Sequence, residues 1–524
     1  MSTLLNRLQE LVAGSTVPYL SFNRDIVDKV GRTTGLLVAT YVVTTASRTL
    51  PIYHFIRAYS AFFGPLSKYP GPFLAKLFDW GDGYYDSPAG TRYLKLMELH
   101  KKYGHIVRIA QNKLSISDKD MIQQILVTDD LPKGHNYEAY QIDGHPTMFD
   151  TTDKTFHKSR RRIVSPAFSL RYIGTMEPLM RTATANLDGV ITKSINEANA
   201  EGREYAKVDL WMMLQHFAMD IIGLAAFGTE FNMVTTGHHP LTTIISNRLK
   251  FTSFIGLHPK ISRWIPKSQD PYLVNFMKDV IQRRIDSGEK RQDILDYLIG
   301  TLNTKSEDDR LKIDDIINEV VLFLIAGSET TSNTMGFLFM EMLNNPHVYE
   351  KLRNEIDAIE MEEGQTMLQN NQVKALPYLN AVIEEALRLH PANPGGALRR
   401  TVNDITLVGK HHIPKNTTVI AMSMATQTHP DYWEEADRFM PERWLDPAEA
   451  KENAMAWFPF SAGSRNCIGK AFSLQEMRIC VSNLVKRFEF LPIESSMEDA
   501  KDRRQFITLG IAKNTFKVRA VLRT

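Results

Sequence analysis

One cysteine of the chain lies in a glycine-rich segment whose spacing suits a thiolate that binds a metal. Cys467 is one of two cysteines among 524 residues, with Gly463 before it and Gly469 after it. A thiolate ligand needs hydrogen-bond donors nearby, and glycine allows the sharp turn that aims backbone amides at the sulfur. Arg465 can pair with a carboxylate, and Phe460 can cover the sulfur. The alternative is a small buried cysteine without a chemical role.

An acid and an alcohol, Glu329 and Thr330, lie in the long apolar segment 313–343. Such a pair can deliver protons to a reacting centre while apolar neighbours hold bulk water away. Glycine within a helix costs about 1 kcal/mol relative to alanine, so the nearby Gly327 needs a reason, and a local widening or kink is one. A solvated helix face with a packing glycine is the other interpretation.

Two groups of charged residues can support such a site. Glu385 and Arg388 are three residues apart and share one helix face, although an exposed pair of this kind stabilises a protein very little. Upstream, His157 and Lys158 begin a basic cluster that continues through the arginines at 160–162. A solvated basic helix face is the alternative for this cluster.

In this order along the chain, the motifs resemble those of the cytochrome P-450 superfamily of haem-thiolate monooxygenases. The resemblance extends from about residue 70 to the C-terminus. It implies haem b (iron protoporphyrin IX) as cofactor, with Cys467 as axial ligand, because a thiolate pushes electron density to the iron and favours O–O cleavage. It also implies that Glu329 and Thr330 relay protons. The residues expected to shape the haem pocket at the cysteine loop are Phe460, Gly463, Arg465 and Gly469.

The resemblance implies further contacts with the haem propionates. The family usually has a tryptophan and, four residues later, an arginine that bind propionates, and these places fall to His157 and Arg161. Histidine departs from the pattern but keeps an N–H donor. Arg400 matches another propionate-binding arginine, with Arg399 as the alternative.

The remaining charged groups are expected to have supporting roles. The resemblance implies that Glu385 and Arg388 are buried, are joined by Arg443, and hold the loop under the haem. The basic residues Lys158, Arg160 and Arg162 are expected to face an acidic electron-donor protein.

The expected function is that of a monooxygenase that inserts one atom of dioxygen into a lipophilic small molecule. By likeness, the electrons come from a separate NADPH–cytochrome P-450 reductase, with cytochrome b5 as a further partner. A steroid or terpenoid is the favoured substrate, because the residues expected around the pocket are mostly apolar. Two alternatives stay open: a haem-thiolate isomerase or dehydratase acting on a peroxide, and a non-catalytic haem binder. The residues expected around the pocket are Tyr137, Tyr140, Met148, Phe149, Phe251, Phe254, Phe323, Ala326, residues 393–397, Leu509 and Ile511.

Helical periodicity dominates the segments that must position these residues. Together with a few short strands, it predicts a mainly α fold with small β-sheets, and the resemblance implies the cytochrome P-450 fold. This fold is a triangular helical prism with the haem between the long central helix and the cysteine loop. The expected helices include 176–198, 208–227, 271–298 and 313–343. The expected strands are 106–109, 113–116, 405–408 and 417–422.

The bulk composition excludes some classes of protein. A formal net charge of +2 argues against a general nucleic-acid binder. Two cysteines do not make a secreted disulfide framework, so a reducing, cytosol-facing compartment is expected, with Cys480 in the core.

The N-terminal segment, residues 1–64, is expected to be membrane-associated and to link to a catalytic domain at 65–524. Its uncharged stretch, residues 33–46, is shorter than the roughly 20 residues of a spanning helix. Leucines at 4, 5, 8 and 11 share one helical face, which can lie on a membrane surface. The alternative is an amphipathic helix packed on the domain. With the likeness, this predicts the endoplasmic reticulum membrane, with the catalytic domain facing the cytosol.

Overall fold

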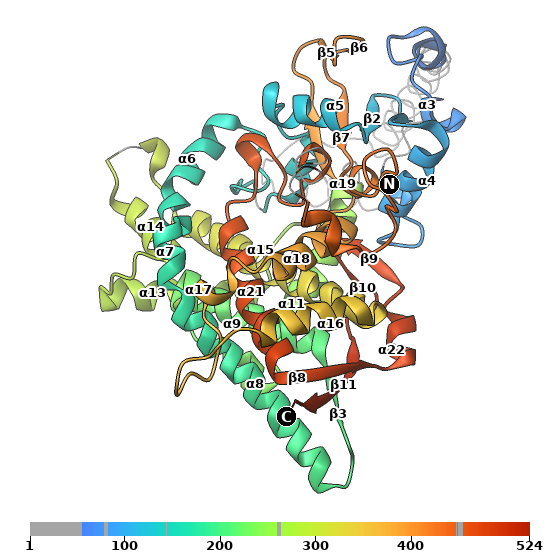
Figure 1. Ribbon diagram of the computed structural model, residues 1–524. Helices are drawn as coiled ribbons and strands as arrows, with labels where there is room; N and C mark the ends of the chain where they lie inside the picture. The colour runs from blue at the N-terminus through green and yellow to red at the C-terminus, as the bar shows by residue number, and fades with distance from the viewer. Residues whose placement is uncertain are drawn as a thin grey trace, which may run out of the picture. The chain divides into compact units, whose positions relative to one another are not determined.

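Helices make up most of the described chain, and short strands form small separate sheets (Figure 1). The computed structural model describes residues 55–77, 82–142, 144–258, 264–305, 307–446, 448 and 454–523. The chain divides into two units, 1–64 and 65–524, and every element named below belongs to the second. The predominance of helices confirms the fold class predicted from the sequence. The membrane-associated stretches predicted within residues 1–54 lie outside the described residues.

The helices that build the interior and the site are long, and shorter ones connect them. The longer helices are α4 (Arg92–Tyr103), α6 (Lys154–Val164), α8 (Glu177–Ala200), α9 (Leu210–Phe227), α11 (Pro240–Leu257), α13 (Pro271–Ser287), α15 (Ile313–Asn344), α16 (Pro346–Asp357), α18 (Pro377–Leu389) and α21 (Lys470–Arg487). The shorter ones are α3 (Phe73–Leu77), α5 (Lys119–Gln123), α7 (Leu170–Thr175), α10 (Met233–Thr236), α14 (Ile294–Gly300), α17 (Asn370–Val373), α19 (Ser423–Gln427) and α22 (Glu494–Asp499).

The largest sheet has the strand order β1-β2-β7-β4, in which β2 and β7 are parallel and the other pairs antiparallel. Its strands are β1 (Ile106–Ala110), β2 (Lys113–Ile116), β7 (Thr418–Ala421) and β4 (Ala397–Arg400). The smaller sheets pair β3 (Ala206–Asp209) and β8 (Phe488–Pro492) with β11 (Lys517–Leu522), β9 (Arg503–Phe506) with β10 (Thr508–Ile511), and β5 (Ile405–Leu407) with β6 (His411–Ile413).

The central helix α15 forms where the sequence predicted it. Asp314 and Asp315 lie in its first turn, where acidic groups stabilise the positive end of a helix. The Asp315 carboxylate accepts a hydrogen bond from the backbone N–H of Lys312 at 3.0 Å. Most residues of α15 are buried, which explains its nearly continuous apolar sequence.

Some predicted boundaries were wrong, each for a local reason. The helix predicted at 208–227 starts only at Leu210, because residues 206–209 pair with β11 as strand β3. The single helix predicted at 271–298 is broken at Gly288, whose φ of 63° ends α13, and Asp293 caps the new helix α14. The helix predicted at 176–198 and the strands near 106 and 113 are confirmed.

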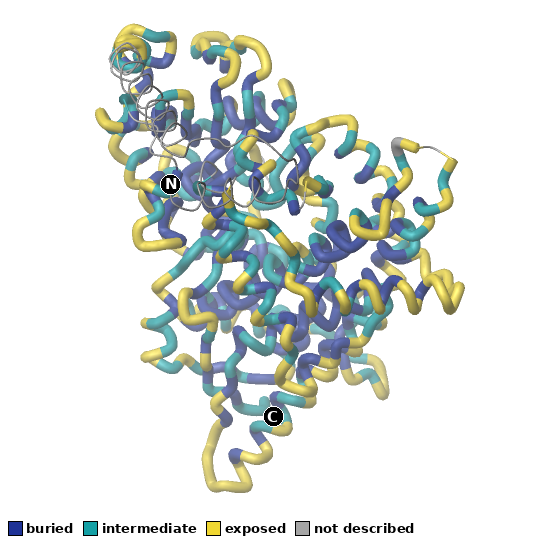
Figure 2. Tube along the Cα trace, turned by 180° about the vertical axis from the view of Figure 1, so that it is seen from behind, coloured by how far each residue is buried: buried dark blue, intermediate teal, exposed yellow. Residues whose placement is uncertain are grey.

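The core lies where α8, α9, α15, α18 and α21 meet. Figure 2 shows buried residues gathered in the interior and exposed ones at the periphery. Helix α9 packs closely on α15, and Trp211 contacts Phe337 with ring centroids 5.2 Å apart. A Cβ at Gly336 would come within 2.4 Å of the Trp211 ring, so glycine allows this approach. Cys480 is fully buried in α21, as predicted.

Candidate functional site

The cysteine loop leads into α21 and is held by backbone bonds. The Cys467 N–H donates to the Phe460 carbonyl at 2.8 Å, and the Asn466 N–H donates to the Gly463 carbonyl at 3.2 Å. Gly463 has a φ of 70°, and a Cβ there would lie 1.8 Å from the Leu126 carbonyl oxygen. Any other residue would therefore displace the loop.

Burial makes the pKa of the Cys467 thiol higher than usual overall, so a thiolate at this position needs a positively charged partner. Burial raises the pKa of the Cys467 thiol, whereas backbone N–H groups of Gly469 and Lys470 and the charge of Arg161 lower it. These donors come from the start of α21 and the opposing helix α6. A Cβ at Gly469 would stand 3.9 Å from the sulfur and 3.9 Å from the Phe168 ring, so glycine keeps room for a flat group beside the sulfur.

A cluster of cationic side chains contains Lys133, Arg399 and Arg465, and the neutral imidazole of His157 lies beside it. Lys133 is buried, and its ammonium donates to the Phe149 carbonyl. Burial, with the charges of Arg399 and Arg465, lowers the pKa of Lys133 well below its usual range. Burial and Arg399 lower the pKa of Arg465 to about 10, and burial with Arg465 and Lys133 lowers that of His157 to about 3. Cations that disfavour one another in this way fit a bound anion, as haem propionates would supply.

The structure places Arg399, not Arg400, in this cluster. Successive side chains of a strand point to opposite faces, and on β4 it is Arg399 whose charge acts on Lys133 and Arg465. Arg399 is 2% exposed. The geometry therefore favours Arg399, the alternative considered from the sequence, over Arg400. The motif fixes the segment but not which of two adjacent arginines faces inward.

Replacing Arg399 by methionine is expected to lower the haem content of the purified protein severely, because the propionates lose a buried cation. The same change at Arg400 is the matched control and should leave the haem-to-protein ratio near that of the wild type. Haem is measured by its pyridine complex, and folding by circular dichroism. A normal haem content in R399M together with a deficit in R400M would contradict the assignment.

Helix α6 carries His157 and Arg161, the two residues that were predicted from the sequence to bind the haem propionates. Asp153 caps the helix, and His157 is buried one turn later. The Arg161 guanidinium donates to the backbone carbonyl and the side-chain oxygen of Asn466, both at 2.7 Å, so Arg161 anchors the loop itself.

The prediction that Arg160 faces a partner protein was wrong. Arg160 is buried and stacks on the Phe156 ring at 4.5 Å. Its neighbours Lys158 and Arg162 are exposed, and Arg162 forms an ion pair with Asp309 at 2.8 Å. Helical spacing turns the side chain at 160 inward while 158 and 162 remain outside.

Glu329 and Thr330 occupy the middle of α15. Burial raises the pKa of Glu329 to about 7, although a hydrogen bond with Asn333 acts in the opposite direction. The carboxyl group can therefore exchange a proton near neutral pH. The Thr330 hydroxyl donates to the Ala326 carbonyl at 2.8 Å and lines a cavity. Gly327 lies within unbroken helix, and a Cβ there would meet Ile222 of α9 at 2.7 Å. Close packing, rather than the expected kink, accounts for this glycine.

Glu385, Arg388 and Arg443 form a fully buried cluster. Two nitrogens of Arg388 bind the two oxygens of Glu385 at 2.8 and 2.7 Å, and Arg443 Nε lies 3.2 Å from Glu385 Oε1. The Trp444 indole also donates to Glu385, at 2.9 Å. Arg388 donates in addition to the backbone carbonyls of Gln427, Ala436 and Arg438. The cluster thus ties α18 to the segment that precedes the cysteine loop.

The cavity lined by Thr330 has a volume of ≈ 300 Å³. Tyr137, Tyr140, Phe149 and Ala326 line it, as do Asn393, Gly395 and Gly396. Helix α11 contributes Leu249, Thr252, Ser253 and Gly256 in place of the predicted phenylalanines, and the C-terminal segment contributes Ile507 and Thr508 in place of Leu509 and Ile511. Leu509 and Ile511 are buried in the core, and Phe323 packs on Phe168.

The cavity is more polar than the sequence predicted. Asp150, Arg248, Gln269 and Asn318 line it together with the apolar side chains. Burial raises the pKa of Asp150 to about 6 and lowers that of Arg248 to about 10. Sequence reasoning missed these residues and Lys133, because each stands alone in its segment and no spacing marks it.

Comparisons with known proteins agree with this geometry. The sequence pattern of the cytochrome P-450 family matches residues 65–519. The chain is 35% identical to cytochrome P-450 monooxygenase acrD of Aspergillus aculeatus over 439 residues, which cover 82% of this chain and 86% of the relative. It is 35% identical to the monooxygenase LUC2 of a Fusarium species over 446 residues, covering 83% and 85%. The monooxygenase FUS8 of Gibberella fujikuroi is 31% identical over 474 residues, covering 87% and 88%.

Proposed function

Since the chain belongs to the cytochrome P-450 family of haem-thiolate monooxygenases, we propose that it hydroxylates a lipophilic small molecule with dioxygen and with electrons from NADPH–cytochrome P-450 reductase. The observation that carries the proposal is the arrangement of α15, whose Thr330 lines a largely apolar cavity and follows the half-buried acid Glu329 in the same helix turn. This places a proton source next to a space that can hold a substrate.

Each residue of the site has a defined task in this proposal. When bound, haem supplies the activation of dioxygen and the transfer of one oxygen atom. Cys467 would hold the haem iron through its thiolate, and the amides of Gly469 and Lys470 would stabilise the charge of that sulfur. His157, Arg399 and Arg465, with Lys133, would hold the propionates. Glu329 holds a proton near neutral pH, and the Thr330 hydroxyl can pass it on.

The lining of the cavity supports a lipophilic substrate that carries a polar group. Aromatic and aliphatic side chains from residues 137–149 and from α15 would bind the apolar body. Arg248, Gln269 and Asn318 can bind an oxygen substituent. A steroid or terpenoid with such a substituent fits this pattern.

The surface beside the cysteine loop supports an acidic electron donor, which we infer to be the reductase, with cytochrome b5 as a second donor. A hollow of ≈ 510 Å³ is lined there mostly by basic side chains. These residues are Lys154, His157, Lys158, Arg161, Arg162 and Arg465, with Asp130 and two serines. Complementary charge speeds the encounter of two redox partners.

A location at the endoplasmic reticulum membrane, with the catalytic domain facing the cytosol, completes the proposal. Among the described residues, one helix is long and apolar enough to cross a membrane, namely α9, but it is largely buried in the core. The residues just before the second unit expose apolar side chains that suit a lipid surface, among them Phe55, Ile56, Tyr59 and Phe63.

The proposal is tested with the purified, reduced protein. It is expected to show the red-shifted carbon monoxide difference spectrum of a haem thiolate, and to oxidise NADPH in the presence of the reductase when a lipophilic substrate is bound. Turnover of a peroxide without reductase would favour an isomerase or dehydratase, and a normal spectrum without NADPH oxidation would favour a haem binder.

The role of Thr330 can be tested against a neighbouring threonine. Thr330→Val should keep the spectrum but form less product per NADPH, because proton delivery is impaired. Thr334→Val is the matched control, since Thr334 makes the same hydrogen bond to the carbonyl four residues earlier but is buried away from the cavity. Equal coupling of NADPH to product in both variants would contradict the relay.

A further inference from the structure

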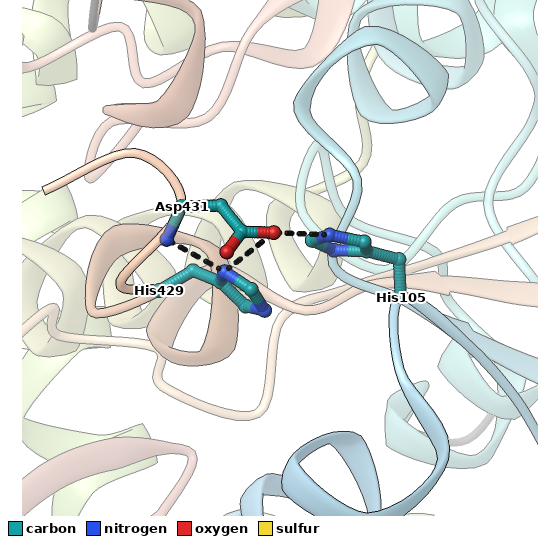
Figure 3. A group of neighbouring side chains, drawn as sticks. All are labelled: His105, His429 and Asp431. Carbon is teal, nitrogen blue, oxygen red and sulfur yellow. Dashed lines mark hydrogen bonds and ion pairs between the residues drawn. The ribbon is translucent and has the colours of Figure 1, made fainter.

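A cluster of two histidines and an aspartate lies outside the site described above (Figure 3). His105 belongs to the turn between α4 and β1, and His429 and Asp431 follow α19. Their ligand atoms all lie within 4.8 Å of one another. Among the residues that the structure describes, this is the one group of three histidine, cysteine or acidic side chains so arranged.

The distances from the Asp431 carboxylate to the two imidazoles suit a tetrahedral metal ion. Bonds of about 2.0–2.2 Å from zinc to nitrogen and oxygen place neighbouring ligand atoms about 3.3 Å apart. In the structure, Asp431 Oδ2 lies 3.2 Å from His105 Nε2 and 3.6 Å from His429 Nδ1. A strong charged hydrogen bond would draw these atoms to about 2.7–2.9 Å. The hydrogen bond between His105 and Asp431 is longer than that, and the contact between His429 and Asp431 is longer still.

Neighbouring groups orient the two imidazoles. His105 Nδ1 lies 3.2 Å from the hydroxyl of the buried Ser117, which leaves Nε2 directed at Asp431. The Tyr432 ring packs against both histidines, with centroid distances of 5.7 and 5.4 Å. A second group that fixes the ring of a metal-binding histidine in this way is usual in metal sites.

The cluster is also open to an ion from solvent. The Asp431 side chain is 62% exposed, while both imidazoles are partly covered. His429 Nδ1 accepts a long hydrogen bond, 3.2 Å, from the Asp431 N–H, and a metal at that nitrogen would have to replace this weak bond.

We propose that His105, His429 and Asp431 bind a Zn²⁺ ion, with water as the fourth ligand. Two imidazole nitrogens and one carboxylate oxygen are ligands that zinc prefers, and a tetrahedral site accepts their spacing. The ion joins the turn before β1 to the segment after α19. His105 and Asp431, which it connects, are 326 positions apart in the chain. Bound zinc therefore stabilises the tertiary structure.

The test uses the full-length, haem-loaded protein without a histidine tag, stripped with EDTA and dialysed against Zn²⁺. Zinc and the iron of the haem are measured together by inductively coupled plasma mass spectrometry. The wild type is expected to retain one zinc per chain, and His105→Ala and Asp431→Asn to bind it more than about tenfold more weakly, with Ser117→Ala weakened to a lesser degree. Zinc should also raise the melting temperature of the wild type but not that of H105A.

His412→Ala is the matched control. His412 faces Asp404 at 3.7 Å on the surface, which is a histidine–carboxylate pair without a third ligand. H412A should bind zinc as the wild type does. The proposal would be overturned if the wild type retained no more zinc than H105A and D431N. The haem content of each variant shows whether the fold is intact.

Discussion

Replacing Cys467 by serine is expected to abolish both the red-shifted carbon monoxide spectrum and oxidative turnover. The serine variant keeps the backbone hydrogen bond of the loop, because the N–H of residue 467, and not its sulfur, donates to the Phe460 carbonyl. It cannot supply a thiolate, since the hydroxyl group of serine is a far weaker acid than a thiol and a poorer ligand for a soft metal ion. The loss should therefore be one of chemistry, with the fold retained.

The second cysteine provides the control for this experiment. Cys480→Ala removes a fully buried thiol from α21 and should reduce stability slightly while leaving the spectrum and the turnover number unchanged. Circular dichroism and haem content are compared across both variants. Persistence of the thiolate spectrum and of turnover in C467S would refute the assignment of the axial ligand.

Replacing Glu385 by alanine is expected to prevent accumulation of folded, haem-loaded protein. The side chains of Glu385, Arg388 and Arg443 have no exposed surface, so the change leaves two guanidinium groups buried without their shared anion. Removing one partner of a buried ion pair costs about 3–5 kcal/mol, which is a large part of the net stability of a typical protein. The yield of soluble protein, its haem content and its denaturant midpoint report the effect.

An exposed pair with the same spacing gives the matched control. Lys95 and Glu98 are three residues apart on α4, lie 3.0 Å from each other and are well exposed. Glu98→Ala should cost at most about 1 kcal/mol. If E385A unfolds at the same denaturant concentration as E98A, the buried cluster does not hold the structure together.

The sequence by itself determined the helical fold class, the extent of α15 and the segment of the cysteine loop. These features depend on local spacing: the periodicity of apolar residues in α15, and glycines such as Gly463, whose φ of 70° a β-carbon would oppose. The close approach of Glu385, Arg388 and Arg443 was also predicted, because the family pattern names all three positions.

Only the tertiary structure decided which side chains face one another. It placed Arg399 in the cationic cluster rather than Arg400, buried Arg160, and showed Gly327 packed against Ile222. It brought His105 beside Asp431 across 326 positions of the chain. The physical reason is that a motif fixes the order and local geometry of residues, whereas the facing of a side chain depends on the packing of segments that are distant in sequence.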